Sequence, residues 1–152
     1  MLGFLGSDPF QHPTLGTFER KGGQWRGTGT LLGARAELRL AGDRKAPSPA
    51  ALAIAEQLGA WVSASRDTLA RELFAHYEPM REAHTEGGFE GELPAIEAAG
   101  GVWPHVTVVH AVVDPAQRGF SVEIHLGVAW DDDHTLGARY LDGVLVELNG
   151  SV

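Results

Sequence analysis

The stretch FSVEIHLGVAW, residues 120–130, decides the fold. Its apolar residues stand at every second position, and between them lie small or polar residues that include Glu123 and His125. A period of two residues is typical of a β-strand with one face buried and the other in water. The sequence therefore predicts a strand over residues 120–130, with Glu123 and His125 on its wet face.

Further strand signals surround this stretch on both sides. Residues 102–113 precede it, and residues 136–141 and 144–148 follow it and flank Asp142-Gly143, a two-residue hairpin signal. In the first third of the chain, the turn sequence Lys21-Gly22-Gly23 separates residues 15–20 from residues 24–32, and residues 34–40 alternate in the same way. Strands are therefore expected at both ends of the chain.

The middle of the chain has helical periodicity. Ser48 can cap a helix and Pro49 suits its first position. A stripe at three- and four-residue spacing follows: Ile54, Leu58, Trp61, Val62, Ser65, Leu69, Leu73 and Tyr77. Because Pro79 disfavours helical geometry at Glu78, the helix is expected to end near Tyr77. We favour one long or slightly bent rod; the alternative is a break into two helices at Gly59 or within residues 63–65.

These elements predict an α+β fold in a single domain that spans residues 1–152. The expected sheet is mainly antiparallel: a β-meander, a long central helix, and a second β-meander, with the helix packed on one sheet face. A chain of 152 residues is long enough to bury a core of its own.

Composition excludes several classes of function. The net charge of −8 disfavours a nucleic-acid partner and suits a basic protein partner. The absence of cysteine removes disulfides, thiolate nucleophiles and cysteine-bound zinc. No apolar run approaches a membrane span, and the N-terminus lacks the basic region of a signal peptide, so a cytoplasmic location is expected.

The acidic cluster Asp131-Asp132-Asp133-His134 follows Trp130 and has two interpretations. Aspartates accept hydrogen bonds from backbone amides two residues on, so the cluster could form a corner between strands that Trp130 closes on the buried side. Alternatively, Asp131, Asp133 and His134 could bind a divalent metal or support acid–base chemistry. We favour the corner.

The same segment resembles a bacterial family of unknown function with a C-terminal W-D-x-E-H-x-L-G signature. Residues 130–137, WDDDHTLG, carry the likeness, and Gly23-Gln-Trp25-Arg-Gly27 matches a G-x-W-x-G hairpin of that family. Asp133 stands where the family usually has glutamate, which weakens a catalytic interpretation more than a turn. The resemblance implies no established activity, although similar proteins look like immunity or accessory proteins of bacterial conflict systems.

A second constellation depends on strand register. If the loop over residues 114–119 joins neighbouring antiparallel strands, Val113 pairs with Phe120 and His110 lies opposite Glu123. His110, Glu123 and His125 would then share the polar face, either as a candidate metal site or as a solvated face with one ion pair. We favour the ion pair, and we expect no cofactor unless a divalent metal binds here or at the acidic cluster.

Two surface features complete the set of candidates. Trp103, at the start of a strand, could mark an interface together with the acidic loop that holds Glu90 and Glu92. The last strand, residues 144–148, could be a sheet edge through which a homodimer forms. With no recognisable catalytic set, the sequence favours a non-enzymatic binding protein, immunity-like or accessory. The alternative is a metal-binding protein or metal-dependent hydrolase.

Overall fold

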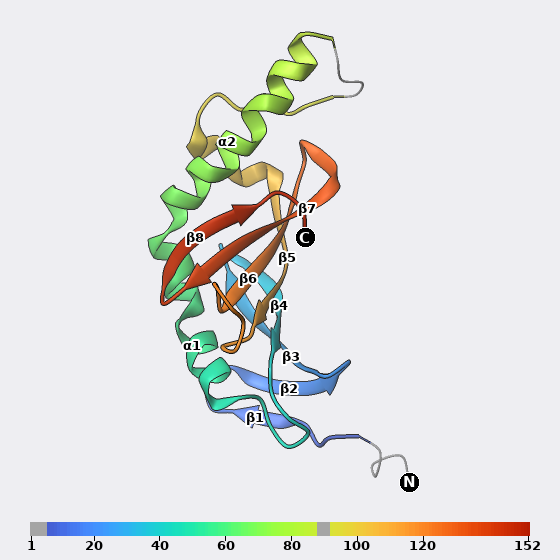
Figure 1. Ribbon diagram of the computed structural model, residues 1–152, viewed down its shortest axis with the longest axis vertical. Helices are drawn as coiled ribbons and strands as arrows, with labels where there is room; N and C mark the ends of the chain where they lie inside the picture. Colours follow the sequence, from blue (N-terminus) through green and yellow to red (C-terminus); the bar gives the residue numbers. More distant parts are fainter. Residues whose placement is uncertain (1–5, 88–91) are drawn as a thin grey trace.

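The fold is known from a computed structural model, which describes residues 6–87 and 92–152. It is a mixed α+β fold with a mostly antiparallel sheet, as the sequence predicts (Figure 1). Eight strands lie in the sheet in chain order: β1 (Phe10–His12), β2 (Gly16–Lys21), β3 (Gln24–Leu31), β4 (Ala34–Leu40), β5 (Val106–Val113), β6 (Val122–Val128), β7 (Asp131–Leu141) and β8 (Val144–Asn149). Among the described strands, β4 and β5 alone pair in parallel, because the helices connect them.

Tight turns connect the antiparallel strands where the sequence offers residues that tolerate a positive φ. Gly22 and Gly23 both have positive φ in the β2–β3 turn. Asp142 and Gly143, at φ 49° and 82°, form the expected two-residue turn between β7 and β8. The hairpin signals were therefore sufficient to place these strand ends.

The expected single helix is two helices. α1 (Pro49–Ala64) ends at Ser65 and α2 (Arg66–Thr85) begins directly after it. The Ser48 hydroxyl accepts from the amide of Ala51, so the predicted start of α1 is confirmed. At the joint, the hydroxyl oxygens of Ser65 and Tyr140 are 2.6 Å apart, which ties the helical break to β7.

The expected helix end near Tyr77 is wrong. α2 continues through Pro79 to Thr85. Proline lacks the amide that would bond the carbonyl four residues earlier, but the buried side chains Leu69, Leu73 and Tyr77 hold the preceding turns against the core. The Tyr77 hydroxyl also donates to the carbonyl of Pro94 at 2.6 Å, which fixes the connection after α2. Two short 3₁₀ turns, η2 (Ala99–Gly101) and η3 (Trp103–His105), then lead into β5.

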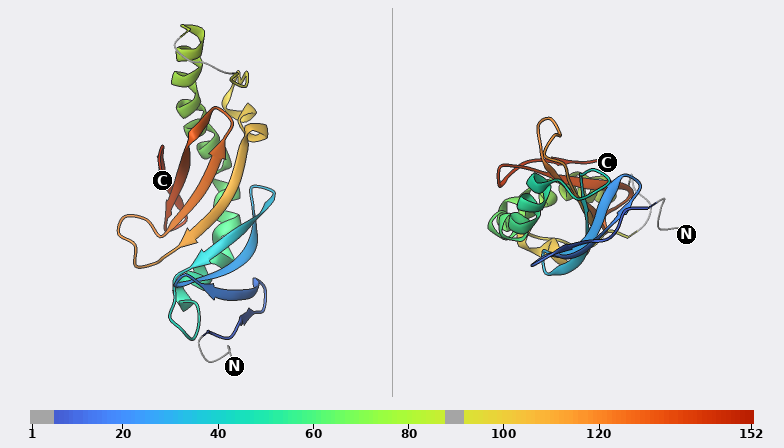
Figure 2. Two further views of the ribbon diagram at one scale, coloured as in Figure 1. Left: turned by 90° about the vertical axis from the view of Figure 1, so that its right-hand side faces the viewer. Right: turned by 90° about the horizontal axis from the view of Figure 1, so that it is seen from below.

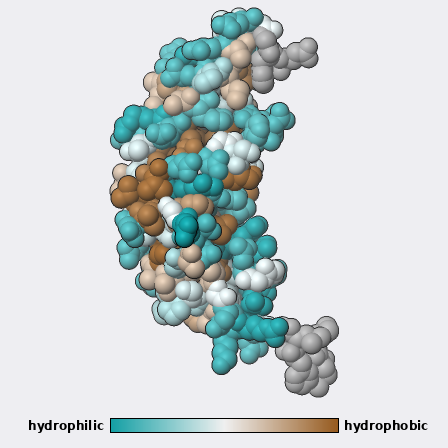
Figure 3. Space-filling view, viewed as in Figure 1, coloured by the Kyte–Doolittle hydropathy of each residue, from teal (hydrophilic) through white to brown (hydrophobic). Residues whose placement is uncertain are grey.

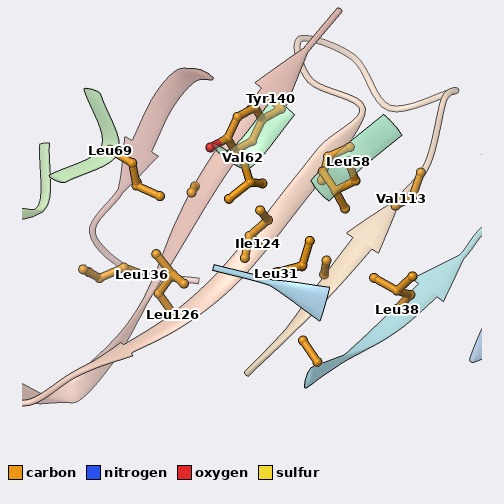
Figure 4. Close-up of a cluster of buried hydrophobic side chains, with 14 of the residues drawn as sticks. Leu31, Leu38, Leu58, Val62, Leu69, Val113, Ile124, Leu126, Leu136 and Tyr140 are labelled. Carbon is orange, nitrogen blue, oxygen red and sulfur yellow. The ribbon is translucent and has the colours of Figure 1, made fainter. Parts of the chain in front are cut away.

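The core lies between the helices and the side chains that alternate inward from the strands. Figure 2 shows the helices behind the sheet in its left view, and Figure 4 shows Leu58 and Val62 of α1 directed towards Ile124 and Tyr140. The burial of β6 alternates without exception, which confirms the period-two prediction for that strand. In the described parts of the chain, no helix is sufficiently long and apolar to cross a membrane.

Candidate functional site

A surface groove of about 390 Å³ lies where the end of β6 meets the starts of β5 and β7. We call it the Asp131 groove. Its lining contains two carboxylates and two imidazoles but no lysine or arginine: Pro104, His105, Thr107, Gly127, Val128, Ala129, Asp131, Asp132, His134 and Thr135. The groove is therefore lined by Asp131, Asp132 and His134 of the acidic cluster that the sequence singles out.

The β6–β7 turn places the acidic cluster at this groove. The turn consists of Ala129 and Trp130, and Asp131 already pairs with Val128 as the first residue of β7. The corner therefore lies earlier than the sequence suggested, and the cluster forms the start of a strand. Trp130 is 1% exposed, so its burial holds the turn against the core.

Asp131 is the organising residue of the cluster. Its side chain is 7% exposed, and its Oδ1 accepts from the Asp133 amide at 3.2 Å. Its Oδ2 lies 2.9 Å from Nδ1 of His134, whose side chain is about half exposed. A largely buried carboxylate thus fixes both the local backbone and the orientation of the imidazole.

A second histidine contacts this centre from α2. The indole N–H of Trp130 donates to Nδ1 of His76 at 2.9 Å, so the proton of the neutral imidazole resides on Nε2. That Nε2 is 3.9 Å from Oδ2 of Asp131, beyond hydrogen-bond distance. Burial lowers the pKa of His76, although the charge of Asp131 opposes that effect. His76 therefore favours the neutral form and links α2 to the β6–β7 turn.

The chemistry available at the groove is recognition of a cation or a hydrogen-bond donor. Asp131 and His134 form an acid–imidazole pair of the type that can orient a base. In the described part of the chain, the hydroxyls of the lining residues Thr107 and Thr135 form no hydrogen bond with the His134 imidazole, which bonds Asp131. Asp132 is exposed at the rim, where its charge is available to a ligand.

The expected register of β5 and β6 is wrong by two residues. Val113 pairs with Val122 and not Phe120, and His110 lies opposite His125 and not Glu123. A β-bulge at Val109 accompanies the shift. Because a two-residue slip preserves the face, the three expected side chains still meet. The rings of His110 and His125 have centroids 4.3 Å apart, and Nε2 of His125 is 2.7 Å from Oε1 of Glu123.

Arginines accompany this histidine pair on the polar face of the sheet. Arg139 Nε donates to Oε2 of Glu123 at 2.6 Å, and Arg139 also bonds Glu147. Burial raises the pKa of Glu123, but hydrogen bonds from Arg139 and His125 outweigh it and hold that pKa below its usual range. Burial and the neighbouring His125 lower the pKa of His110 to about 4.

Neither constellation is arranged as a metal centre. Within residues 6–87 and 92–152, no three histidine, aspartate or glutamate side chains are placed to hold a metal ion together. At the histidine pair, both oxygens of Glu123 are engaged by His125 and Arg139. These ion pairs form a row across the wet face of the sheet.

The candidate interface at Trp103 is only partly described. Trp103 is half-buried in η3, with the guanidinium of Arg66 4.5 Å above its ring. Glu92 is exposed, whereas Glu90 lies outside the described residues. An interface formed by Trp103, Glu90 and Glu92 therefore stays a prediction.

Sequence reasoning missed His76 and His105 as members of the site. His76 belongs to a helix 54 residues before Trp130, and no spacing rule connects the two. His105 reaches the groove because η3 leads into β5 beside the β6–β7 turn. The one available signal was that His76 falls next to Tyr77, at the edge of the helical apolar stripe.

Comparison with known proteins gives a family but no activity. No curated protein and no solved structure matched the chain. A domain described as a domain of unknown function, DUF6985, matches residues 14–151, which is consistent with the expectation of a family of unknown function. The chain therefore belongs to the DUF6985 family.

Proposed function

We propose that this protein is a non-enzymatic binding protein that receives a cationic group of a basic partner protein in the Asp131 groove. The observation that carries the proposal is the lining of the groove, which has carboxylates at Asp131 and Asp132 and no basic side chain except imidazoles. The net charge of −8 would attract such a partner over a longer range and accelerate its association.

The geometry of Asp131 supports binding over catalysis. Its carboxylate is held by His134 and by the Asp133 amide, so it contributes a fixed negative charge without needing to reorganise. Asp132 supplies a second, exposed carboxylate at the rim. A lysine or arginine side chain that enters the groove would meet both charges, and pre-ordered charges cost less to bind than mobile ones.

A cationic probe tests the groove itself. N-acetylarginine amide should shift the backbone amide NMR signals of residues 131–135 in a saturable manner, whereas N-acetylglutamine amide should not. Asp132→Asn should weaken the arginine effect severalfold. Asp133→Asn is the matched control, because Asp133 is exposed but does not line the groove. Equal shifts from both probes, or no saturation, would refute the groove as a cation site.

The biological role that fits this site is an immunity-like or accessory protein that masks a basic surface of its partner. The products of genes adjacent to the one encoding this chain are the natural partners to test by calorimetry. Binding should weaken as salt increases, and Asp132→Asn should weaken it in parallel with its effect on the arginine probe. A partner whose affinity changes neither with salt nor with Asp132→Asn would bind outside the Asp131 groove.

A further inference from the structure

His76 lies where three segments that are far apart in the chain meet. It belongs to α2, and its Nδ1 accepts the indole N–H of Trp130 in the β6–β7 turn at 2.9 Å. The segment after β8 also approaches the ring, because a Cβ placed on Gly150 would lie 3.6 Å from Nε2 of His76. The imidazole therefore joins the helix to the turn that positions Asp131 at the groove.

The hydrogen bond from Trp130 requires a neutral imidazole. An indole N–H can only donate, so Nδ1 of His76 must keep its lone pair. A protonated imidazole carries N–H groups on both nitrogens and has no acceptor, and flipping the ring would only bring a carbon to the place of Nδ1. Protonation of His76 therefore breaks this bond and leaves the donor of Trp130, which is 1% exposed, without a partner.

The charged groups that face His76 come from β7. Oδ2 of Asp131 is 3.9 Å from Nε2 of His76, and the same oxygen is 2.9 Å from Nδ1 of His134. Burial has the largest effect on the pKa of His76 and lowers it, Asp131 opposes that effect, and His134 adds to it. In the described part of α2, Glu72, one turn earlier, is exposed and forms no ion pair with His76. The segment after β8 presents the uncharged Gly150.

A charged His76 would change the groove in two ways. It would attract Oδ2 of Asp131 away from His134 and offset the negative charge that Asp131 supplies. It would also release the β6–β7 turn, because the bond to Trp130 is lost. The His76 side chain is 21% exposed, and Figure 3 shows a mostly hydrophilic surface where Figure 1 places the β6–β7 turn, so protons from solvent can reach the ring.

We propose that His76 is a proton-sensitive switch for the Asp131 groove: at neutral pH it holds the β6–β7 turn through Trp130, and on acidification it releases Trp130 and pairs with Asp131. Because burial lowers the pKa of His76, the change occurs below the ordinary histidine pKa of about 6.5. The switch rests on the proposed function for what the groove binds, but the rearrangement itself needs no ligand.

The indole N–H signals in NMR spectra test the rearrangement without a ligand. Between about pH 7.5 and about pH 5, the Trp130 signal should shift and lose protection from solvent exchange relative to that of Trp25. Trp25 is the internal control, because its indole donates at 2.8 Å to the backbone carbonyl of Asp43, which does not titrate. A Trp130 signal that behaves like that of Trp25 throughout this range would overturn the proposal.

Two variants assign the effect to His76. In His76→Asn, the side-chain oxygen can still accept from Trp130 but does not titrate, so the pH-dependent shift of the Trp130 signal should disappear. Trp130→Phe should raise the pKa of His76, because protonation then breaks no hydrogen bond, and this result remains informative if His76→Asn does not fold. A Trp130 shift that persists in His76→Asn, or an unchanged pKa of His76 in Trp130→Phe, would refute the switch.

A cationic probe connects the switch to the groove. From about pH 7.5 to about pH 5, binding of N-acetylarginine amide should weaken about two- to fivefold more in the wild type than in His76→Asn. His134 and the carboxylates of the groove are the same in both proteins, so the difference reports His76. Equal losses in both proteins would show that His76 does not control the groove. If the probe binds at neither pH, the proposed function fails, while the Trp130 signal still decides whether the rearrangement occurs.

Discussion

At the residue scale, Asp131 is the groove residue whose side chain is most tightly constrained by burial and hydrogen bonds. Its side chain is almost fully buried, and it receives hydrogen bonds from both a backbone amide and an imidazole. A buried carboxylate is tolerated only when its oxygens are satisfied in this way. Asp131 therefore stabilises the turn and, at the same time, supplies a negative charge to the groove.

Replacing Asp131 by asparagine should destabilise the fold. Asp131→Asn removes the charge that faces His134 and should lower the free energy of unfolding by about 1–3 kcal/mol. Urea denaturation followed by tryptophan fluorescence measures the change. The exposed Asp133 provides the comparison, and Asp133→Asn should change stability by less than about 0.5 kcal/mol. Equal effects of the two variants would show that Asp131 is not the organising residue.

His110 should make stability depend on pH. Its pKa is about 4 in the folded chain and about 6.5 when unfolded, so the unfolded state binds more protons between these values. Stability should therefore fall as the pH decreases from 6.5 towards 4. His110→Gln should reduce the slope, by about 1 kcal/mol over the range once solvent screening on this half-exposed face is allowed for.

The measurement for His110 is urea denaturation at several pH values in parallel for the two proteins. The tilted ring of His125 packs against His110, and Glu37, Arg26 and Arg39 also act on His110, so the difference between the two proteins isolates the contribution of His110. Parallel pH profiles for the wild type and His110→Gln would contradict the assignment.

At the element scale, α2 shows how packing overrides a local breaker. Pro79 lies inside the helix and deprives the Ala75 carbonyl of its usual amide donor. The helix nonetheless continues to Thr85, with Tyr77 buried just before the proline and anchored to the chain after the helix. Local propensity is a weak guide where tertiary contacts fix the adjacent turns.

Replacing Pro79 by alanine should stabilise the protein. The substitution restores the missing amide donor, and the gain exceeds the added entropy of the unfolded chain. We expect the free energy of unfolding to rise by about 1–2 kcal/mol in urea denaturation. Glu78→Ala, next to Pro79, should change it by less than about 0.5 kcal/mol. A destabilised Pro79→Ala variant would mean that the proline geometry itself is needed for packing.

At the scale of the whole molecule, one hydrophobic cluster joins both ends of the sheet. Trp25 on β3 and Trp130 at the β6–β7 turn belong to the same set of buried residues, together with Leu58 of α1 and Leu69 of α2. A shared core couples the elements that contribute to it, so they should not unfold separately.

Unfolding should therefore be a single cooperative transition, as expected for one domain. Thermal or urea unfolding followed by far-UV circular dichroism and by tryptophan fluorescence should give coincident curves. Leu58→Ala should shift both curves together and cost about 2–5 kcal/mol. Two separate midpoints, or a shift in only one signal, would show that the chain contains independent units.

The sequence by itself located β2 to β6, β8, the start of α1 and the hairpin turns, but it gave no signal for β1 and placed the start of β7 too late. The alternation of Val122, Ile124 and Leu126 and the pair Asp142-Gly143 are local signals, and each expresses a backbone preference over a few residues. The acidic cluster was also visible as a candidate, because its members are contiguous. It was not visible that the turn falls at Ala129 and Trp130.

Only the tertiary structure decided the rest. The β5–β6 register depends on a bulge, the continuation of α2 depends on burial beyond Pro79, and the link from Trp130 to His76 joins residues far apart in the chain. The physical reason is common to all three: packing between distant elements selects among local conformations of similar energy. No pattern within a short stretch of sequence encodes that choice.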